Sequence, residues 1–523
     1  MIIQQMLERF LSNNREFVIA AFAVPASFVY RVADGLNHWI YRTFRNTSTK
    51  HDEAVRVIQK LVREGFRNGQ RMCTARKPWK SMSLRTADFK EDMLRIPIDH
   101  LRNVLEIDER RGIVRAEPMM TMGDITHFLV RRGFALAVQA EMDDLTLGGL
   151  CMGVGIETTS HREGFVFETV VAFEIVTADG ELVRCTCDRN ADLFRALPWS
   201  HGTLGFLVAV ELRIVPIKPF VKLDYEPFHS LEALVARLEE LTASPDAPRF
   251  IEGLVYSNSS GVILQGDFAT PPLPFGGGRV NRINNYYKPW FYSHVAESLG
   301  SRGAFSEYIP VRHYFHRHTP SVFFQLKDLI RFANTALYRY LWAWMGAPKI
   351  SLLKLTMTRE LRRQAFEKRV AQDILVPMDC LVESVQLSDD LFDIYPLWVC
   401  PVRLFNHGDQ GGFLRNPANG AKSQMFVDLG IYGLPVGSET GDYDAVQATR
   451  HLEQFVRRCG GYQMLYADIC MTRSEFETMF DHRLYHTMRQ RTVAVDAFPD
   501  VYAKVIPERW LRAGNVALRR MEG

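Results

Sequence analysis

The stretch Asp144-Leu-Thr-Leu-Gly-Gly-Leu-Cys-Met-Gly-Val-Gly-Ile-Glu-Thr-Thr-Ser-His161 decides the fold. Its four glycines have no Cβ atom, so the backbone there can adopt positive φ and approach a ligand closely. Successive exposed N–H groups in such a loop can bind a pyrophosphate without a lysine. The threonine and serine hydroxyls beside them add further donors. By spacing alone, tight turns in a β-rich domain explain the glycines equally well.

Two familiar phosphate-binding motifs do not match this stretch. Gly153 and Gly155 form a G-x-G pair, but residue 158 is a threonine and no βαβ unit surrounds the pair. The Rossmann fingerprint is therefore absent. No Gly-Lys-Ser/Thr follows either, which excludes a Walker loop.

The flanking sequence predicts helices and short strands in a mixed order. Thr121 can cap a helix with Asp124 three residues on, and strand pairs surround two turn-forming stretches. This mixture is typical of an α+β domain. The expected elements are strands over 104–107, 113–116, 170–176, 182–185 and 206–215, and helices over 52–69, 122–132, 191–197, 474–480 and 507–521.

The chain of 523 residues is too long for one compact core. Pro216 and Pro219 mark the first boundary after the flanking α+β unit, and patterning changes again near residue 455. We expect four parts, which are 1–50, 51–219, 220–455 and 456–523.

Composition excludes several classes of protein. With 47% hydrophobic and 24% charged residues, the chain is typical of a globular protein without long disorder. A net charge of +3 gives little support to nucleic-acid binding. Eight scattered cysteines match neither a zinc site nor a disulfide framework. His313, His316 and His318 have no acidic or thiol ligand beside them, so no metal site is predicted.

The N-terminus carries an uncharged, mostly apolar run from Phe17 to Tyr30. As a helix it reaches about 21 Å, short of the roughly 30 Å hydrocarbon core of a bilayer. Trp39 and Tyr41 beyond it suit the headgroup boundary. We expect a retained anchor that dips into, or just spans, one membrane. The alternative is a buried helix packed on the body of the protein.

The order of hairpin, capped helix, glycine-rich loop, second hairpin and Gly-Thr-Leu-Gly205 resembles the FAD domain of the vanillyl-alcohol-oxidase (PCMH-type) superfamily. By this resemblance, residues 74–83 form a first phosphate loop, the glycine-rich stretch lines the pyrophosphate and ribityl chain, and 202–205 approach the adenine half. The implied cofactor contacts are Arg76, Ser81, Thr146, Leu147, Gly148, Gly149, Leu150, Cys151, Met152, Gly153, Val154, Gly155, Ile156, Glu157, Thr158, Ser160, Gly202 and Gly205.

Members with a histidyl-linked flavin usually carry a histidine in the first phosphate loop. None lies between Cys73 and Arg85, so we expect noncovalent FAD. His161 is a second candidate for attachment and is more readily explained as a hydrogen-bonded side chain.

Longer strings narrow the resemblance. Pro198-Trp-Ser-His-Gly-Thr-Leu-Gly-Phe-Leu-Val208, Asn285-Tyr-Tyr-Lys-Pro-Trp-Phe291 and Gln463-Met-Leu-Tyr-Ala-Asp468 closely resemble the Δ24-sterol reductase family, known as seladin in animals and Diminuto in plants. That family implies an FAD-containing, NADPH-using enzyme of the endoplasmic reticulum membrane, with its catalytic body facing the cytosol. The implied fold is α+β, with a PCMH-type FAD-binding domain split in sequence around a substrate (cap) domain and preceded by an N-terminal membrane anchor.

The chemistry of an isolated side-chain alkene limits the mechanism. A proton delivered to C24 builds positive charge on C25, which a hydride from flavin N5 can quench, and a dry pocket keeps water away from that charge. NADPH has no fingerprint of its own here, so we expect it to visit the flavin in turn with the sterol.

Tyr466 is the preferred proton donor or relay, and the alternative is a core aromatic residue. Glu157 and His161 are other possible acids. Lys288 either anchors a phosphate or shapes the substrate entrance, unless it merely extends outward from aromatic packing.

Two other functions stay open at this point. One is an FAD-dependent oxidase or dehydrogenase of a hydroxylated substrate, and the other is a catalytically degenerate flavin- or sterol-binding protein. The sequence contains no signal for the oligomeric state.

Overall fold

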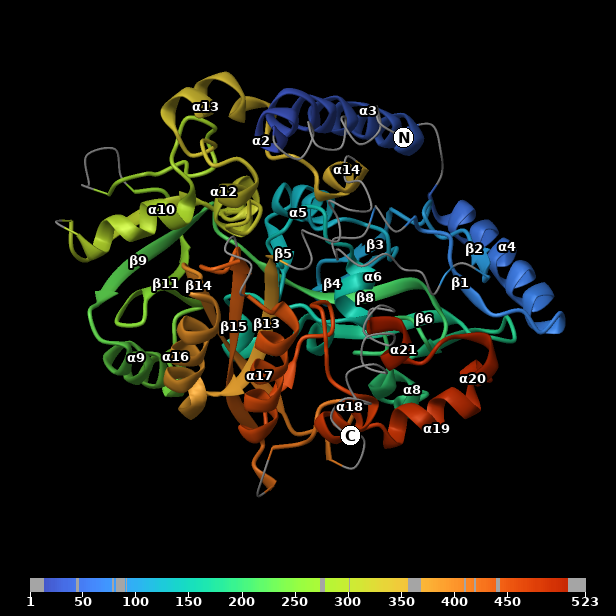
Figure 1. The fold of residues 1–523 in the computed structure, drawn as a ribbon. Coiled ribbons are helices and arrows are strands. Elements are labelled where there is room, and N and C mark those ends of the chain that lie inside the picture. The colour runs from blue at the N-terminus through green and yellow to red at the C-terminus, as the bar shows by residue number, and fades with distance from the viewer. Residues whose placement is uncertain are drawn as a thin grey trace, which may run out of the picture.

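The computed structural model describes residues 14–43, 47–77, 80, 90, 92–272, 278–300, 302–355, 368–408, 411–417, 420–438 and 443–506. Two sheets make up its centre, and helices pack around them (Figure 1). The prediction of a mixed α and β architecture is confirmed. The helix expected over 507–521 lies outside the described residues.

The N-terminal segment is helical from Arg15 to Thr43. Helix α2 (Arg15–Val18) continues through the π-helical turn η1 (Ile19–Ala23) into α3 (Val24–Thr43), and α4 (Thr47–Arg67) follows. The apolar run Phe17–Tyr30 therefore belongs to a longer helix than expected. Its span Arg15–Leu36 is long and apolar enough to cross a membrane by length and composition.

The first sheet has six strands in the order β3-β4-β8-β6-β7, with β5 also paired to β8. Both predicted strand pairs form antiparallel hairpins, and Thr121 accepts a hydrogen bond from the Asp124 backbone as predicted. The strands are β3 (Val104–Asp108), β4 (Ile113–Ala116), β5 (Phe134–Leu136), β6 (Val170–Val176), β7 (Leu182–Cys185) and β8 (Phe206–Pro216). The helices of this part are α5 (Met122–Val130), α6 (Leu147–Met152), α7 (Ser160–Glu163), η4 (Val166–Thr169) and α8 (Ala191–Ala196). A separate parallel pair, β1 (Met72–Thr74) and β2 (Leu94–Ile96), lies next to α4.

The second sheet has eight antiparallel strands in the order β12-β9-β11-β10-β14-β15-β13-β16. One face packs against α9, α16 and α17, and the other face carries most of the shorter helices (Figure 1). The strands are β9 (Phe220–Phe228), β10 (Phe250–Ser257), β11 (Ser260–Ala269), β12 (Phe305–Pro310), β13 (Val370–Pro377), β14 (Leu397–Phe405), β15 (Ser423–Gly433) and β16 (Tyr462–Gln463). The helices are α9 (Leu231–Ala243), α10 (Phe291–Ala296), η5 (Glu297–Leu299), α11 (Val311–Phe315), η6 (Thr319–Ser321), α12 (Leu326–Leu329), α13 (Ala336–Leu341), η7 (Ala343–Met345), α14 (Ile350–Leu355), η8 (Met378–Cys380), α16 (Leu381–Phe392) and α17 (Ala445–Arg458).

The boundary expected after residue 455 falls inside helix α17. The helix continues to Arg458, and β16 then pairs with β13, so the second sheet is completed by residues beyond 455. The remaining helices return to the first sheet, where the Phe498 ring packs 5.3 Å from that of Phe206. These helices are α18 (Arg473–Met479), α19 (Arg483–Arg491), α20 (Ala494–Ala497) and α21 (Val501–Val505).

Candidate functional site

The glycine-rich stretch folds as a short helix and an extended loop. Helix α6 ends at Met152, and residues 153–157 have no regular structure. None of its four glycines has positive φ, which corrects the expectation from the sequence. Positive φ occurs instead at Gly202 (74°) and Gly205 (155°).

Packing inside the protein explains why two of these positions are glycine. A Cβ atom on Gly153 would lie 2.5 Å from the carbonyl oxygen of Gly149. A Cβ atom on Gly155 would lie 2.6 Å from the Val166 side chain. Such contacts are far inside van der Waals separation, so a larger residue must displace the loop.

The loop also presents unused hydrogen-bond donors. Among the described residues, none accepts a hydrogen bond from the backbone N–H groups of Val154, Gly155 and Ile156. Buried amides are nearly always paired in folded proteins. Three consecutive amides of this kind fit an anionic or polar ligand such as the diphosphate and ribityl chain of FAD.

The segment expected to form the first phosphate loop, and Lys90 after it, place cationic groups next to the glycine-rich stretch. The Arg76 guanidinium donates to the Thr146 hydroxyl at 3.4 Å and to the backbone oxygen of Lys80 at 2.8 Å. Its buried Nε has no acceptor among the described residues. Lys90 donates to the backbone oxygen of Arg76 at 2.8 Å, and burial lowers the pKa of the Lys90 amine. Both cations fit a phosphate; Ser81, the other candidate of this loop, lies outside the described residues.

The turn around Gly202 is closed by the C-terminal helices. Trp199 and His201 have positive φ like Gly202. Arg489 donates to the backbone oxygen of Thr203 at 3.1 Å, and Lys504 donates to that of His201. This part of the candidate site therefore depends on residues almost 300 positions further along the chain.

A buried arginine joins the glycine-rich segment to the second sheet. Arg317 is 1% exposed and donates to Glu252 Oε1 and Oε2, each at 2.7 Å, and to Glu157 Oε1 at 2.8 Å. Glu141 Oε2 lies 3.4 Å from the same guanidinium. The backbone N–H of Ile251 also donates to the oxygen of Thr158 at 2.9 Å. The two sheets are thus rigidly connected at the end of the glycine-rich stretch.

The three carboxyl groups around Arg317 are not equivalent. Burial raises the pKa of Glu157 and raises that of Glu141 well above its ordinary value, although Arg317 opposes both shifts. Burial also favours neutral Glu252, but the Arg317 charge outweighs it and holds the pKa of Glu252 below its ordinary value. One cation among three acids thus keeps Glu252 ionised and favours a proton on its neighbours.

Both ring nitrogens of His161 lie within hydrogen-bonding distance of backbone oxygens. Its side chain is fully buried, with Nδ1 3.1 Å from the oxygen of Thr158 and Nε2 2.9 Å from the oxygen of Pro248. Burial lowers its pKa to about 4, so it is neutral at pH 7. Neither the flavin attachment nor the acid role considered for His161 is supported by these surroundings.

The three histidines of the 313–318 segment point to different partners. His313 Nδ1 accepts from the backbone N–H of Asn284, His316 Nε2 lies 3.0 Å from the Thr126 hydroxyl, and His318 is fully buried next to Glu252. Because each histidine contacts a different partner, their closeness in sequence reflects packing and not a shared ligand.

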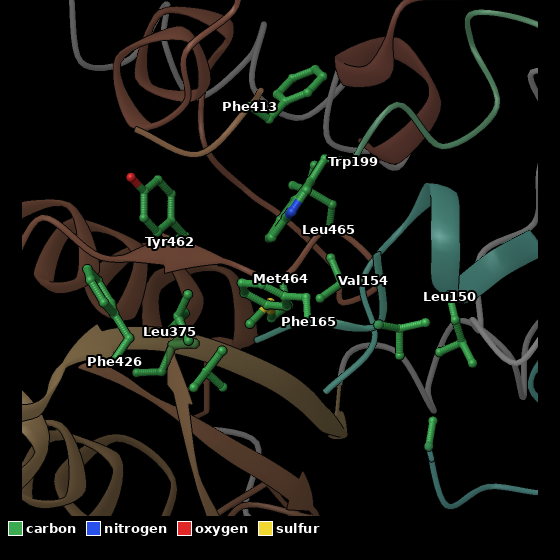
Figure 2. Close-up of a cluster of buried hydrophobic side chains, with 14 of the residues drawn as sticks. Leu150, Val154, Phe165, Trp199, Leu375, Phe413, Phe426, Tyr462, Met464 and Leu465 are labelled. Atoms are coloured by element: carbon green, nitrogen blue, oxygen red, sulfur yellow. The ribbon is translucent and has the colours of Figure 1, made fainter. Parts of the chain in front are cut away.

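Tyr466 lies beside a pair of buried aspartates on the second sheet. Asp373 on β13 faces Gly430 on β15, which places Asp428 and Tyr432 on the same face of the sheet. The hydroxyls of Tyr432 and Tyr466 both hydrogen-bond to Asp373. The Tyr466 residue is 39% exposed, whereas Met464 and Leu465 before it are fully buried. Figure 2 shows Met464 and Leu465 between Leu375 of β13 and Val154 of the glycine-rich loop.

Among the described residues, no cation neutralises this aspartate pair. Burial raises the pKa of Asp373 to about 7, despite the hydrogen bonds from the two tyrosines. Burial and the Asp373 charge raise the pKa of Asp428 well above its ordinary value. The pair therefore holds at least one proton at neutral pH. Burial, and then the two aspartates, also raise the pKa of Tyr466 well above its ordinary value, which keeps its hydroxyl protonated.

Lys288 lines a cavity of about 240 Å³ between the aromatic segment 283–291, the segment 319–350 and the N-terminal helix. Met142 to Asp144, at the start of the glycine-rich stretch, form another wall. Lys288 therefore faces a cavity whose lining does not include the Asp373 cluster.

The sequence did not single out Asp373, Asp428 or the role of Arg317. Aspartates inside the apolar strands 370–377 and 423–433 are the signal that points to them, because an acid at a buried strand position requires a partner or a proton. Their pairing across strands was not visible from spacing.

Gly153→Ala is expected to reduce the fraction of protein that retains FAD through gel filtration by at least about tenfold. The added methyl must push the loop away from the Gly149 carbonyl and misalign the three unused amides. Gly133→Ala is the control for glycine loss, because no atom lies within 4 Å of its Cβ position, although its positive φ adds strain. Full retention in Gly153→Ala, with unchanged flavin absorbance, would remove the loop from cofactor binding.

Asp373→Asn is expected to flatten the pH dependence of stability. The folded-state pKa of Asp373 is about 7, above its unfolded value, so its contribution is fully present below the unfolded pKa and is lost as pH rises through 7. At roughly 1.4 kcal/mol per pKa unit, the loss in the wild type between pH 5 and pH 8 reaches about 3 kcal/mol. Urea unfolding at pH 5 and pH 8 measures it, with exposed Asp390→Asn as control. An equally steep fall in Asp373→Asn would assign the pH dependence to other groups.

The family model for an FAD binding domain matches residues 68–186. This range contains the first phosphate loop, the glycine-rich stretch and both hairpins. The mouse L-gulonolactone oxidase is 31% identical over 125 residues, which are 24% of this chain and 28% of the oxidase. The chain is therefore a protein with an FAD-binding domain.

Similarity over nearly the whole chain defines the family more closely. The human Δ24-sterol reductase is 43% identical over 501 residues, covering 95% of each chain. The Δ24-sterol reductase of Pisum sativum is 37% identical over 510 residues, covering 93% of this chain and 89% of the plant protein. The chain belongs to the Δ24-sterol reductase family.

Proposed function

We propose that this protein is an FAD-dependent, membrane-associated oxidoreductase that reduces the side-chain Δ24 double bond of sterols with NADPH. One observation supports it beyond family membership. Tyr466 interacts with a proton-holding aspartate pair on the second sheet. The two residues before it, Met464 and Leu465, are drawn with Val154 of the glycine-rich loop in one buried cluster (Figure 2), and an alkene needs a proton donor near such a flavin-binding loop.

The proposed cofactor contacts follow from the unused donors. Arg76 and Lys90 meet the diphosphate, the amides of 154–156 continue along the chain of the cofactor, and the turn at Gly202 meets the adenine half. The C-terminal helices would then complete the FAD domain. The two parts of that domain would precede and follow the second, substrate-binding sheet in the sequence. Bound noncovalently, FAD supplies the hydride that it receives from NADPH.

The proton follows a route through side chains of this chain. Tyr466 delivers its hydroxyl proton to C24 as the hydride reaches C25, and Asp373 returns a proton to Tyr466 through their hydrogen bond. Asp428 stays neutral beside Asp373 and prevents two negative charges from meeting. Glu157 is tied to Arg317 and positions the loop. The net reaction consumes one NADPH and one proton for each alkene.

The cellular setting extends this proposal. A sterol substrate and an apolar N-terminal helix both favour a membrane location, and we propose the endoplasmic reticulum with the catalytic body in the cytosol.

Anaerobic stopped-flow mixing tests the function. NADPH is expected to bleach the absorbance of the oxidised flavin in the purified holoenzyme, and desmosterol to restore it in the second mixing step, whereas cholesterol, which lacks the double bond, does not. Bleaching by a hydroxylated substrate, with no response to desmosterol, would instead identify an oxidase or dehydrogenase. A flavin that responds to none of them would identify a binding protein.

A further inference from the structure

The N-terminal helix has two contrasting sides. Its inner side packs on the body of the protein and is fully buried at Val24 and Ser27. Its outer side, from Phe17 to Leu36, is apolar and exposed. The large exposed side chains are Phe17 (67%), Phe22 (69%), Val29 (65%), Val32 (56%) and Leu36 (54%).

Polar contacts attach this helix to the body from Glu16 to Asp34. A helix that crossed a bilayer would lose them and carry Glu16, Arg31 and Asp34 into the hydrocarbon, which is costly. The contacts are Glu16 Oε2 with the Arg331 backbone N–H at 3.1 Å, Ser27 Oγ with the Lys349 N–H at 2.9 Å, Arg31 with the Ala347 oxygen at 2.7 Å, and Asp34 with Arg102 at 3.1 Å.

A second exposed apolar group lies beside the helix. The rings of Phe28 and Trp344 lie 5.5 Å apart, edge to face, and Figure 1 shows α13 next to α2 and α3 along one side of the molecule. The exposed side chains of α13 and η7 are Leu337 (70%), Tyr340 (62%), Leu341 (52%) and Trp344 (53%). We call the outer side of residues 17–36 and these four side chains the apolar rim.

The cavity that Lys288 lines is bounded by the same elements that carry the apolar rim. Arg31 of the N-terminal helix, Tyr338 of α13 and Ala343 of η7 line one part of it. Trp290 and Asp144 line another part, and Asp144 starts the glycine-rich stretch. The cavity thus lies between the elements that carry the rim and the first residue of the glycine-rich stretch.

We propose that the apolar rim inserts into one leaflet of a membrane with the N-terminal helix parallel to the membrane plane, and that this cavity is the entrance through which a sterol leaves the leaflet. The entrance rests on the proposed function, whereas the membrane contact rests on the rim alone.

The composition of the rim fits a lipid leaflet. Nine large apolar or aromatic side chains form it, and tryptophan and tyrosine favour the boundary between headgroups and acyl chains. Arg331, 81% exposed at one end of the helix, suits the lipid headgroups. A helix with one apolar outer side is the form in which proteins bind one leaflet without crossing it. The proposed substrate is itself a membrane lipid, so an entrance that faces the leaflet would let it pass directly from the membrane into the protein.

Flotation of the full-length holoenzyme with phosphatidylcholine vesicles tests the membrane contact. Phe22→Glu with Trp344→Glu is expected to lower the bound fraction at least tenfold, because both charges would enter the leaflet. Val57→Glu is the matched control, since Val57 is 54% exposed on α4, away from the rim. Equal flotation of the rim variant and the control would overturn the proposal, and so would a wild-type holoenzyme that binds another protein through the rim but never binds vesicles.

Protease protection tests the orientation of the helix. An epitope placed before Met1 is expected to remain fully cleavable when the holoenzyme is bound to the outside of intact vesicles, because an in-plane helix leaves it on the side of the body. Protection of the epitope until detergent is added would show a spanning helix and overturn the proposal.

Ala343→Trp tests the entrance, since the indole fills the cavity beside Tyr338. We expect at least a tenfold higher KM for desmosterol in vesicles and an unchanged rate of flavin reduction by NADPH. An unchanged KM would exclude the entrance. If the wild type reduces desmosterol neither in vesicles nor in detergent, the proposed function and the entrance both fail, while flotation still decides the membrane contact.

Discussion

Tyr466→Phe is expected to lower kcat for Δ24 reduction by about 10²- to 10³-fold, while NADPH reduces the bound flavin at the wild-type rate. The change removes one oxygen atom and leaves the ring, so the packing of the aromatic side chain is preserved. What disappears is the only link between Asp373 and the alkene in the proposed route. Because the substitution affects proton transfer and not sterol binding, KM for the sterol should change little.

Rapid mixing separates the two half-reactions of Tyr466→Phe. Tyr462→Phe is the matched control, because Tyr462 lies four residues earlier in the same segment and its hydroxyl accepts from the Arg415 backbone instead. The proposal for Tyr466 fails if sterol reoxidises the flavin equally fast in both variants. A loss in both half-reactions would assign Tyr466 a structural role.

Arg317→Met is expected to have the largest effect on stability, a loss of about 3–5 kcal/mol. Methionine fills much of the same volume, but three carboxyl groups then surround no cation. The buried Glu252 carboxylate is destabilised most, because Arg317 holds the pKa of Glu252 below its ordinary value despite complete burial. The variant should either bind a proton at Glu252 or separate the two sheets.

Chemical unfolding of the purified holoenzyme measures this loss. Arg312→Met changes an exposed arginine on helix α11, five residues before Arg317, and should alter stability by less than about 0.5 kcal/mol. Adding Glu252→Gln to Arg317→Met should restore part of the stability, since the unpaired, buried Glu252 carboxylate is removed. No recovery in the double variant would show that the arginine acts through packing rather than charge.

Local patterns predicted the first sheet well. The strands 170–176 and 182–185 and the capped helix after Thr121 occur where expected, because turn residues, caps and alternation act within a few positions. The conformation of the glycines was predicted wrongly. Glycine is required both where φ is positive and where neighbouring atoms leave no space for a Cβ atom. At Gly153 and Gly155 the second reason applies, because Gly149 and Val166 lie too close, and these neighbours are known only from the fold.

Long-range pairing limited the prediction of the site. Tyr466 was singled out from a family motif, but its partners Asp373 and Asp428 lie on strands whose register no spacing reveals. The cluster around Arg317 likewise combines segments near residues 141, 157, 252 and 317. Sequence patterns locate such residues only as acids or bases in apolar surroundings.

The C-terminal contacts to the Gly202 turn have a consequence for biosynthesis. Arg489 and Lys504 emerge from the ribosome about 300 residues after the turn that they close, and Tyr466 arrives only slightly earlier. A nascent chain can fold its first sheet but cannot enclose a nucleotide there. If the Gly202 turn binds the adenine half as proposed, we expect flavin to bind only after translation is complete. A polypeptide that ends before residue 460 should then be recovered as colourless protein, even from cells supplied with excess riboflavin.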